Sequence, residues 1–173
     1  SYSQADKQSM FYRIEVLIKQ LVDMTCAGLG VLAISPLMLF TAIAIRFESE
    51  GNPIYSQVRI GLGEKPFHIY KFRSMWTGER RSEDRIRNRE NPKKLFKSEN
   101  DPRITLVGKI IRKLSIDELP QLFNVLKGQM SLVGPRPPIV HEFEEMNLFH
   151  RKKFHALPGL TGLWQITGRV YNE

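Results

Sequence analysis

The sequence is poor in residues that build disulfide-linked or metal-bound scaffolds. Its 173 residues include one cysteine, Cys26, which lies in an apolar run. A disulfide framework and a cysteine-rich metal site are therefore excluded, and a reducing, cytosol-facing setting is favoured for the polar part of the chain. The four histidines show no metal-ligand spacing near acidic residues, so we interpret them as surface or interface residues: His68, His141, His150 and His155.

Acidic residues are in the minority. The chain has 26 lysines and arginines against 18 aspartates and glutamates, a net charge of +8. This balance predicts an anionic partner, which could be nucleic acid, an anionic membrane surface or a phosphorylated substrate. A basic membrane-tethered module that binds nucleic acid or an acidic polymer is the alternative to an enzyme. It is disfavoured because the chain lacks a cluster of base-stacking aromatic residues.

Residues 26–45 form the one long apolar run, about the length that spans a bilayer. No cleavage site for a secretory signal peptide is evident. Ser35-Pro36 lies near the centre of the run, where proline removes a backbone donor and breaks or kinks a helix. Each half is then about 15 Å long, half of the ~30 Å hydrocarbon core. A re-entrant segment and a kinked spanning helix both fit this pattern.

Basic residues flank the apolar run on both sides, with Arg13 and Lys19 before it and Arg46 after it. The positive-inside rule would place both flanks on the cytoplasmic face, which favours re-entry. The preceding residues have apolar side chains at helical spacing and interfacial aromatics, typical of an amphipathic approach to the membrane. A soluble core helix is the alternative for that segment.

The polar part begins with two strand-like stretches, 54–60 and 67–72, separated by the turn "GLGEKP". We predict a β-hairpin, since a lone "GLG" is too weak a pattern for a nucleotide-binding loop. Lys71 and Arg73 follow where the second strand ends. Such a cationic pair can hold a diphosphate, and a charged strand edge is the alternative.

Three further segments are interpreted from their charge and apolar pattern. Residues 77–103 are a charged insertion without catalytic content, and residues 104–114 have the apolar periodicity of a helix. Residues 139–157 are helical in pattern and end basic. They are predicted either to lie along lipid headgroups or to form a surface helix of the domain.

The motif "SIDELPQ" carries two adjacent carboxylates, Asp117 and Glu118. Ser115 and Glu118 match a capping box, a purely structural device. Pro120 argues for a helix that begins near Asp117, because proline is tolerated only in the first turn. That helix would run to the stop at Lys127-Gly128, and its N-terminus would stabilise an ionised aspartate or a bound phosphate.

Cations flank these acids in the sequence. Arg112 precedes them, and Arg136 lies in the rigid stretch "VGPRPP". An ionised carboxylate between fixed cations suits attack on a diphosphate, because carboxylates act as nucleophiles through acyl-phosphate intermediates. A divalent ion would be needed to neutralise phosphate charge, and oxygen ligands from Asp117 and Glu118 would favour Mg²⁺.

The order of these motifs resembles the bacterial sugar transferases, the monotopic polyprenyl-phosphate phosphoglycosyl transferases. The resemblance covers nearly all of residues 20–170. It rests on the apolar run with its central Ser-Pro, "YKFRSM", "NDPRIT", "IRKLSIDELPQLFNVLKGQMSLVGPRP" and "PGLTGLWQITGR". It implies transfer of a sugar-1-phosphate from a UDP-sugar to undecaprenyl phosphate with release of UMP, the step that initiates capsule, O-antigen or exopolysaccharide assembly.

The resemblance also implies roles for individual residues. Asp117 corresponds to the nucleophile that takes the phosphosugar covalently in a ping-pong scheme with Mg²⁺. Glu118 corresponds to its acidic partner, which assists metal binding or proton handling. Arg112 and Arg136 correspond to residues at the phosphate site, and Ser35-Pro36 to the break that makes the membrane helix re-entrant.

Other family positions are less clearly assigned. Gln165 and Arg169 fall in a region near the family's active site, where a nucleotide or sugar role and a packing role are equally open. Gln129 stands where many members carry an acid, so no metal role is assigned to it. The ends of the chain differ from those of larger members, which leads us to expect a longer natural protein whose N-terminal membrane region and C-terminal helices are missing here.

The predicted fold class is α+β and mostly helical. Residues 1–47 are expected to form the amphipathic approach and re-entrant membrane helix, and residues 48–173 a small cytosolic catalytic domain with a short hairpin and membrane-interface amphipathic helices. The expected location is the cytoplasmic face of the bacterial inner membrane. Expected partners are a UDP-sugar, undecaprenyl phosphate and anionic lipids, but not nucleic acid. A homo-oligomer is compatible with the sequence, and the sugar is left open.

Overall fold

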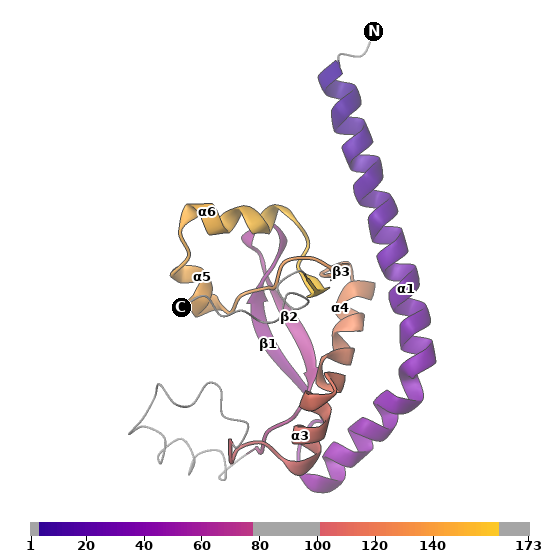
Figure 1. Ribbon diagram of the computed structural model, residues 1–173, viewed down its shortest axis with the longest axis vertical. Coiled ribbons are helices and arrows are strands. Elements are labelled where there is room, and N and C mark those ends of the chain that lie inside the picture. Colours follow the sequence, from indigo (N-terminus) through magenta and orange to yellow (C-terminus); the bar gives the residue numbers. More distant parts are fainter. Residues whose placement is uncertain (1–3, 78–100, 163–173) are drawn as a thin grey trace. The chain divides into compact units, whose positions relative to one another are not determined.

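The computed structural model describes residues 4–77 and 101–162, with side chains from Ile14 onward. The described part is mostly helical, with a β-hairpin and a short pair of parallel strands (Figure 1). This confirms the predicted class of a mostly helical α+β protein. Residues 78–100, most of the predicted charged insertion, lie outside the described residues.

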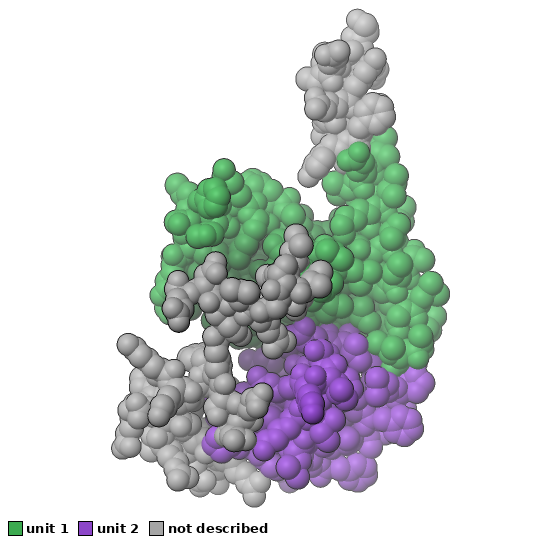
Figure 2. Space-filling view, viewed as in Figure 1, with its two compact units in different colours: residues 1–34, 57–69, 121–173 green, residues 35–56, 70–120 purple. Residues whose placement is uncertain are grey.

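The chain divides into two compact units that interleave along the sequence (Figure 2). Unit 1 comprises residues 1–34, 57–69 and 121–173, and unit 2 comprises residues 35–56 and 70–120. The predicted boundary after residue 47 divides a membrane segment from a cytosolic domain. This is a different division from the one into two compact units. It therefore remains a prediction.

The longest element is helix α1, Gln4–Glu48, which carries Pro36 in its interior. The sequence predicts a helix that kinks or breaks at Ser35-Pro36. The residues there keep the helical assignment, so α1 does not end at this dipeptide, and the re-entrant course stays a prediction. Proline removes one N–H and crowds the preceding turn, which a helix can accommodate as a bend without ending. The boundary between the two units falls just before this dipeptide, between Ile34 and Ser35.

Within the described residues, α1 is the one helix long and apolar enough to cross a membrane. Its apolar side chains are largely uncovered, and Leu32 and Phe40, for example, are 73% and 70% exposed. Exposure on this level is unusual for a helix of a water-soluble core and is typical of a surface that meets lipid.

Strands β1 (Ile54–Ile60) and β2 (Pro66–Phe72) pair as the predicted hairpin, within one residue of the expected bounds. The turn between them contains a short 3-10 helix, η1 (Leu62–Glu64). Gly63 and Glu64 both have φ near +60° there. Glycine adopts this left-handed conformation without steric cost, which explains the glycine-rich turn.

Unit 1 has its own apolar core. Ala27 of α1 packs in it with Phe67 of β2 and with Val125 of helix α4 (Leu122–Leu126). Helix α4 ends at Leu126 with Lys127 as its C-cap, and Gly128 follows with φ of 68°, so the predicted stop at Lys127-Gly128 is confirmed. The cluster also includes buried Ile69, Leu122 and Met130.

A parallel strand pair in unit 1 was not predicted. Strand β3 (Ser131–Val133) lies beside β4 (Gly159–Thr161), with Ser131 opposite Gly159. A side chain at Gly159 would meet the backbone nitrogen of Gly134 at 2.0 Å, so only glycine allows this close approach. The pair joins the "SLVG" and "PGLTG" motifs, which are far apart in the sequence.

A polar cluster ties α1 to β3 in the same unit. The amine of Lys19 donates to the carboxylate of Asp23, 2.7 Å away, and to the hydroxyl of Ser131. Asp23 and Ser131 are buried, so their polar groups need these partners. The sequence offered one sign of this cluster, the four-residue spacing of Lys19 and Asp23 on a helix.

Unit 2 is organised around helix α3, Leu106–Lys113, which confirms the helix predicted for residues 104–114. Ile111 of α3 packs against Ile45 of α1 and Phe72 of β2 in a small buried cluster. The N-terminus of α3 is capped twice. The hydroxyl of Thr105 accepts a bond from the N–H of Gly108, and the carboxylate of Glu48 accepts from the N–H groups of Leu106 and Val107.

The predicted helical segment 139–157 consists of three short helices instead of one. These are α5 (Val140–Glu144), α6 (Leu148–Arg151) and the 3-10 helix η4 (Lys152–His155). Asn147 interrupts the series because its side chain accepts a bond from the N–H of His150 and so begins a new helix. Leu148 and Phe149 are then 84% and 72% exposed.

Candidate active site

The two adjacent acids lie on the 3-10 helix η3, Ile116–Gln121, in its first turn. The capping box proposed for Ser115 and Glu118 is wrong. Ser115 has φ of 57°, whereas an N-cap residue is extended, and it follows directly on the C-cap of α3. The carboxylate of Glu118 does not turn back to cap a helix and is engaged elsewhere. Pro120 is accommodated in η3, ahead of α4.

Glu118 pairs with Lys71, the residue before the last of β2. The amine of Lys71 lies 2.7 Å from Oε1 of Glu118, and the two side chains are 27% and 30% exposed. The pair joins the hairpin to η3 across 47 residues of sequence. It is therefore partly shielded from solvent but still open enough to meet a ligand.

Asp117 lies beside this pair in a setting that opposes its ionisation. Burial raises the pKa of the Asp117 carboxyl above its usual range, and the negative charge of Glu118 adds to the rise. Lys71 and Arg112 act in the other direction. An acid with a raised pKa is a stronger nucleophile once ionised, and nearby cations supply the stabilisation that ionisation needs.

Arg112 is an exposed residue in the last turn of α3, close enough for its charge to act on Asp117. Unit 2 thus brings together four of the predicted site residues, two acids and two cations. All four come from neighbouring positions on β2, α3 and η3.

Arg73 was predicted to act with Lys71 but has a different environment. It is 7% exposed, and its guanidinium donates to the backbone oxygen and the hydroxyl of Ser49, at 2.7 and 2.8 Å. A side chain at Gly51 would collide with it at 2.7 Å. Arg73 therefore anchors the segment that follows α1, and its assignment to phosphate stays a prediction without support from these contacts.

The acid pair fits a magnesium ion only in company with a substrate. Among the residues that the structure describes, no group of three or more histidine, cysteine or acidic side chains could form a metal cage. Mg²⁺ is commonly held by one or two carboxylates together with substrate phosphates. Asp117 and Glu118 can supply such oxygens, although Oε1 of Glu118 already faces Lys71.

Arg136 belongs to unit 1 and lies in the proline-rich loop before α5. Its guanidinium lies 3.6 Å from Oε1 of Glu142, and its side chain is 50% exposed. Glu142 also accepts a bond from the N–H of Ile139 and so caps α5. Arg136 is thus held at the surface of the proline-rich loop by a carboxylate that was not singled out in the sequence.

Gln129, whose role was left open, supports the buried Asn124. The amide of Asn124 donates to Oε1 of Gln129 at 2.9 Å and to the backbone oxygen of His68 at 2.6 Å. Asn124 is fully buried, which requires such partners. Gln129 therefore helps to fix α4 against the hairpin within unit 1. The predicted nucleotide or sugar residues, Gln165 and Arg169, lie outside the described residues.

The arrangement in unit 2 suits nucleophilic chemistry on an anion. A carboxylate of raised pKa lies beside two cations that can stabilise negative charge as it develops on a phosphoryl group. Its acidic neighbour is held by one of those cations. The sequence predicted the residues of this group but not the Lys71–Glu118 pairing.

Comparisons with known proteins identify the family of the chain. Residues 14–173 match the family described as bacterial sugar transferase. A galactosyl transferase of Streptococcus agalactiae is 46% identical over 171 residues, covering 97% of this chain and 38% of the relative. An undecaprenyl-phosphate galactose phosphotransferase of Salmonella typhimurium is 45% identical over 159 residues, covering 88% of this chain and 33% of the relative.

The chain spans about a third of the length of these two relatives. An exopolysaccharide production protein of Rhizobium meliloti is shorter, and 40% identity over 158 residues covers 88% of this chain and 70% of that protein. The match of the family over nearly the whole chain, together with these relatives, establishes that the chain belongs to the bacterial sugar transferase family.

Proposed function

We propose that the chain transfers a sugar-1-phosphate from a UDP-sugar to undecaprenyl phosphate, releasing UMP, as the first membrane step of capsule, O-antigen or exopolysaccharide assembly. The observation that carries the proposal is the carboxyl of Asp117, with its raised pKa, beside the Lys71–Glu118 pair. The names of the relatives, which include undecaprenyl-phosphate galactose and glucose phosphotransferases, supply the substrate class.

The proposed reaction has two displacements at phosphorus. An oxygen of ionised Asp117 attacks the phosphorus that carries the sugar, and the bond from that phosphorus to the bridging oxygen breaks, so UMP leaves. A phosphate oxygen of undecaprenyl phosphate then attacks the same phosphorus and releases the Asp117 carboxylate. The products are UMP and undecaprenyl-diphosphate-sugar, and the enzyme returns to its initial state.

The cations have separate tasks in this scheme. Arg112 and Lys71 stabilise the charge that builds on the phosphoryl oxygens, and they keep Asp117 ionised against the effect of burial. Glu118 positions Lys71 through their 2.7 Å contact. Mg²⁺, held by Asp117 or Glu118 with substrate phosphates, would neutralise the charge of the diphosphate when bound.

The membrane arrangement is part of the same proposal. Helix α1 is proposed to re-enter the membrane with its bend at Ser35-Pro36, so that both ends and the catalytic residues face the cytoplasm at the inner membrane. Its exposed apolar surface and its basic flanks support this arrangement. Anionic lipids would then meet the basic surface of the chain.

The deciding experiment measures UMP release. The reconstituted protein would be supplied with Mg²⁺, undecaprenyl phosphate and a panel of UDP-glucose, UDP-galactose and N-acetylated or deoxy UDP-sugars. We expect one sugar to support turnover and to leave a phosphosugar adduct on Asp117 when the acceptor is omitted. Turnover unaffected by Asp117→Asn would overturn the mechanism, and no UMP from any sugar would overturn the activity.

A further inference from the structure

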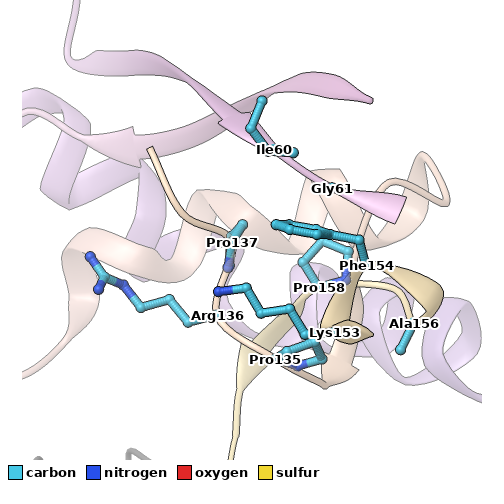
Figure 3. A pocket seen from close by; sticks show the side chains of 9 residues that line it. All are labelled: Ile60, Gly61, Pro135, Arg136, Pro137, Lys153, Phe154, Ala156 and Pro158. Carbon is cyan, nitrogen blue, oxygen red and sulfur yellow. The ribbon is translucent and has the colours of Figure 1, made fainter. Parts of the chain in front are cut away.

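A small pocket of unit 1 lies beside the proline-rich loop (Figure 3). Its lining includes three prolines, the apolar side chains of Ile60 and Phe154 and the cations Arg136 and Lys153, and its volume is about 150 Å³. Pockets that enclose a small-molecule ligand have volumes of ~300–1,000 Å³. This pocket is too small to enclose a ligand of that kind.

In unit 2, one carboxylate joins the end of helix α1 to the start of α3. Oε1 and Oε2 of Glu48 accept hydrogen bonds from the N–H groups of Leu106 and Val107, at 2.5 and 3.0 Å. These N–H groups lie in the first turn of α3, where a helix has no internal partners for them. The contacts span 58 and 59 residues of sequence, so they hold the helix against a distant part of the chain.

Helix α3 also touches the segment that follows β2. The N–H of Thr105 donates to the backbone oxygen of Ser74 at 3.1 Å. A side chain at Gly108 would meet the same oxygen at 2.1 Å, so only glycine allows this close approach. This contact fixes where α3 meets the segment, and Glu48 fixes where the N-terminus of the helix points.

The opposite end of α3 leads directly into the candidate active site. The N–H of Ser115 donates to the oxygen of Arg112 at 3.2 Å, and the N–H of Glu118 donates to the oxygen of Ser115 at 3.3 Å. The acid pair is therefore bonded to the helix, whereas Lys71 lies on β2. A tilt of α3 would change the distance between Lys71 and the acids, which is 2.7 Å at Glu118.

We propose that Glu48 is a positioning residue: by holding α3 against the end of α1, it keeps the two acids in place beside Lys71. The inference rests on the proposed function, which gives Lys71 and the acids their roles. Glu48 acts through α3 and contacts no reacting atom in this scheme. Because α1 is the membrane helix of the proposed arrangement, the same contact links the membrane segment to the active site.

The first test separates positioning from simple capping of the helix. Glu48→Gln removes the charge and one of the two acceptor oxygens. Thr105→Ala removes the local cap of the same helix, a 2.8 Å bond from the N–H of Gly108, and Glu50→Gln removes an equal charge at an exposed position. We expect Glu48→Gln to lower kcat about tenfold with an unchanged KM for the UDP-sugar, because small misplacements of reacting groups are costly.

Both controls should keep kcat within about threefold of wild type, although Thr105→Ala should lower the melting temperature as much as Glu48→Gln does, because each variant loses a cap. Equal losses of kcat in Glu48→Gln and Thr105→Ala would show that Glu48 only prevents fraying and would overturn the proposal.

A double-mutant cycle with Lys71→Met tests the route of the effect. If Glu48 acts by keeping the acids beside Lys71, then Glu48→Gln should lower kcat by less than about threefold once Lys71 is gone. Two independent effects would multiply, and a full tenfold further loss would contradict the proposed route.

A spectroscopic test does not depend on activity. In a Cys26→Ala background, Phe40→Cys on α1 and Lys113→Cys on α3 introduce spin labels at two exposed positions of unit 2. Pulsed electron paramagnetic resonance measures the distribution of distances between them. Glu48→Gln should broaden this distribution, and Thr105→Ala should leave it unchanged.

The spectroscopic result also separates this inference from the proposed function. An unchanged distribution in Glu48→Gln, with UMP released by the wild type, overturns the positioning role alone. A broadened distribution in a protein that releases no UMP from any sugar overturns the proposed function and leaves the link between α1 and α3 standing.

Discussion

Asp117 occupies a place in which its charge is costly to the fold. Burial raises its pKa, so the folded protein binds this proton more tightly than the unfolded chain does. Stability that comes from this group is present at low pH and falls as pH rises above the unfolded value near 3.9. An ionised carboxylate at this site lowers the stability of the fold. Its proposed role as the nucleophile explains why the residue is an aspartate.

Asp117→Asn is therefore expected to stop transfer while making the protein more stable. At pH 7 the neutral amide avoids the cost of the buried charge, so the melting temperature should rise by about 1–3 °C. UMP release should fall at least about 10³-fold, because the nucleophile is lost. Thermal unfolding followed by tryptophan fluorescence at a fixed scan rate, together with UMP assays, measures both effects.

The pH dependence provides the control for that variant. At about pH 2, below both the unfolded pKa near 3.9 and the raised folded pKa, both states of the wild type carry a protonated Asp117, so the stability difference between wild type and variant should disappear. A variant that melts lower than wild type at pH 7 would contradict the argument that burial disfavours the Asp117 charge.

The charges of Lys71 and Glu118 change the pKa of Asp117 in opposite directions. Replacing one residue or the other should therefore shift the pH–rate profile in opposite directions. Lys71 lowers the pKa of Asp117, so Lys71→Met should move the acidic limb of kcat/KM to higher pH. Glu118 raises that pKa, so Glu118→Gln should move the limb to lower pH. Each variant should also lose about 10²-fold in kcat.

A purely structural role of the Lys71–Glu118 ion pair would not shift the acidic limb of kcat/KM in opposite directions in the two variants. Either substitution breaks the 2.7 Å contact between the two side chains, so a purely structural role predicts similar losses and no opposite displacement of the limb. Shifts in the same direction for both variants would mean that their charges do not tune Asp117.

Much of the candidate site could be predicted from residue types, but not which cations it includes. Lys71 and Arg73 are both basic and two positions apart, which in a continuing strand would place them on one face. Strand β2 ends at Phe72, so the alternation does not extend to Arg73, which turns into the interior and binds Ser49. Tertiary contacts of this kind leave no mark in local sequence.

Among the elements, the junction between α3 and η3 is the place where backbone conformation matters most. Ser115 closes α3 with φ of 57°, and its N–H donates to the oxygen of Arg112 at 3.2 Å. A residue with a side chain pays about 1–2 kcal/mol in this left-handed conformation, whereas glycine does not. The strain lies two residues before Asp117, the first of the two acids.

Ser115→Gly should therefore stabilise the protein. The relief of strain outweighs the greater entropy of glycine in the unfolded chain, leaving a gain of about 0.5 kcal/mol and a melting temperature about 1–2 °C higher. Chemical denaturation and thermal melting in the same detergent measure the change. The capping box would predict the reverse sign, since a serine N-cap is better than a glycine.

Elements that depend on residues near in the sequence could be predicted. Elements that depend on residues distant in the sequence could not. Helix α3 follows from its apolar periodicity, and the end of α4 follows from Gly128. The pairing of β3 with β4 joins three-residue strands that depend on a partner 28 residues away, as Ser131 faces Gly159. Such short strands have no periodicity to detect, and the one sign of them was the glycine that permits their contact.

For the molecule as a whole, the membrane arrangement follows from charge and apolar length. The chain carries +8 overall, with basic residues on both sides of its apolar run. The continuous helix α1 is compatible with spanning and with re-entry, because secondary structure does not record which face of a bilayer each end reaches. The positive flanks favour re-entry, with both ends in the cytoplasm.

Cysteine labelling can decide between the two arrangements, and the single native cysteine makes the design simple. In a Cys26→Ala background, Gln8→Cys and Glu50→Cys each introduce one thiol, before and after the apolar run. Re-entry predicts that a membrane-impermeant maleimide labels both in inverted inner-membrane vesicles and neither in right-side-out vesicles. Labelling of the two thiols from opposite sides would establish a spanning helix and contradict the proposed arrangement.

The same preparation tests why the helix would re-enter. Pro36→Leu restores a backbone donor and removes the crowding in the preceding turn, so the helix can straighten across the ~30 Å core. The cysteine at position 8 should then become labelled from the opposite face, while the one at position 50 should not change. UMP release should fall with it, because the bend would no longer hold the catalytic residues at the cytoplasmic interface. If Pro36→Leu moves neither the label nor the activity, the positive flanks alone determine the arrangement and the proline does not.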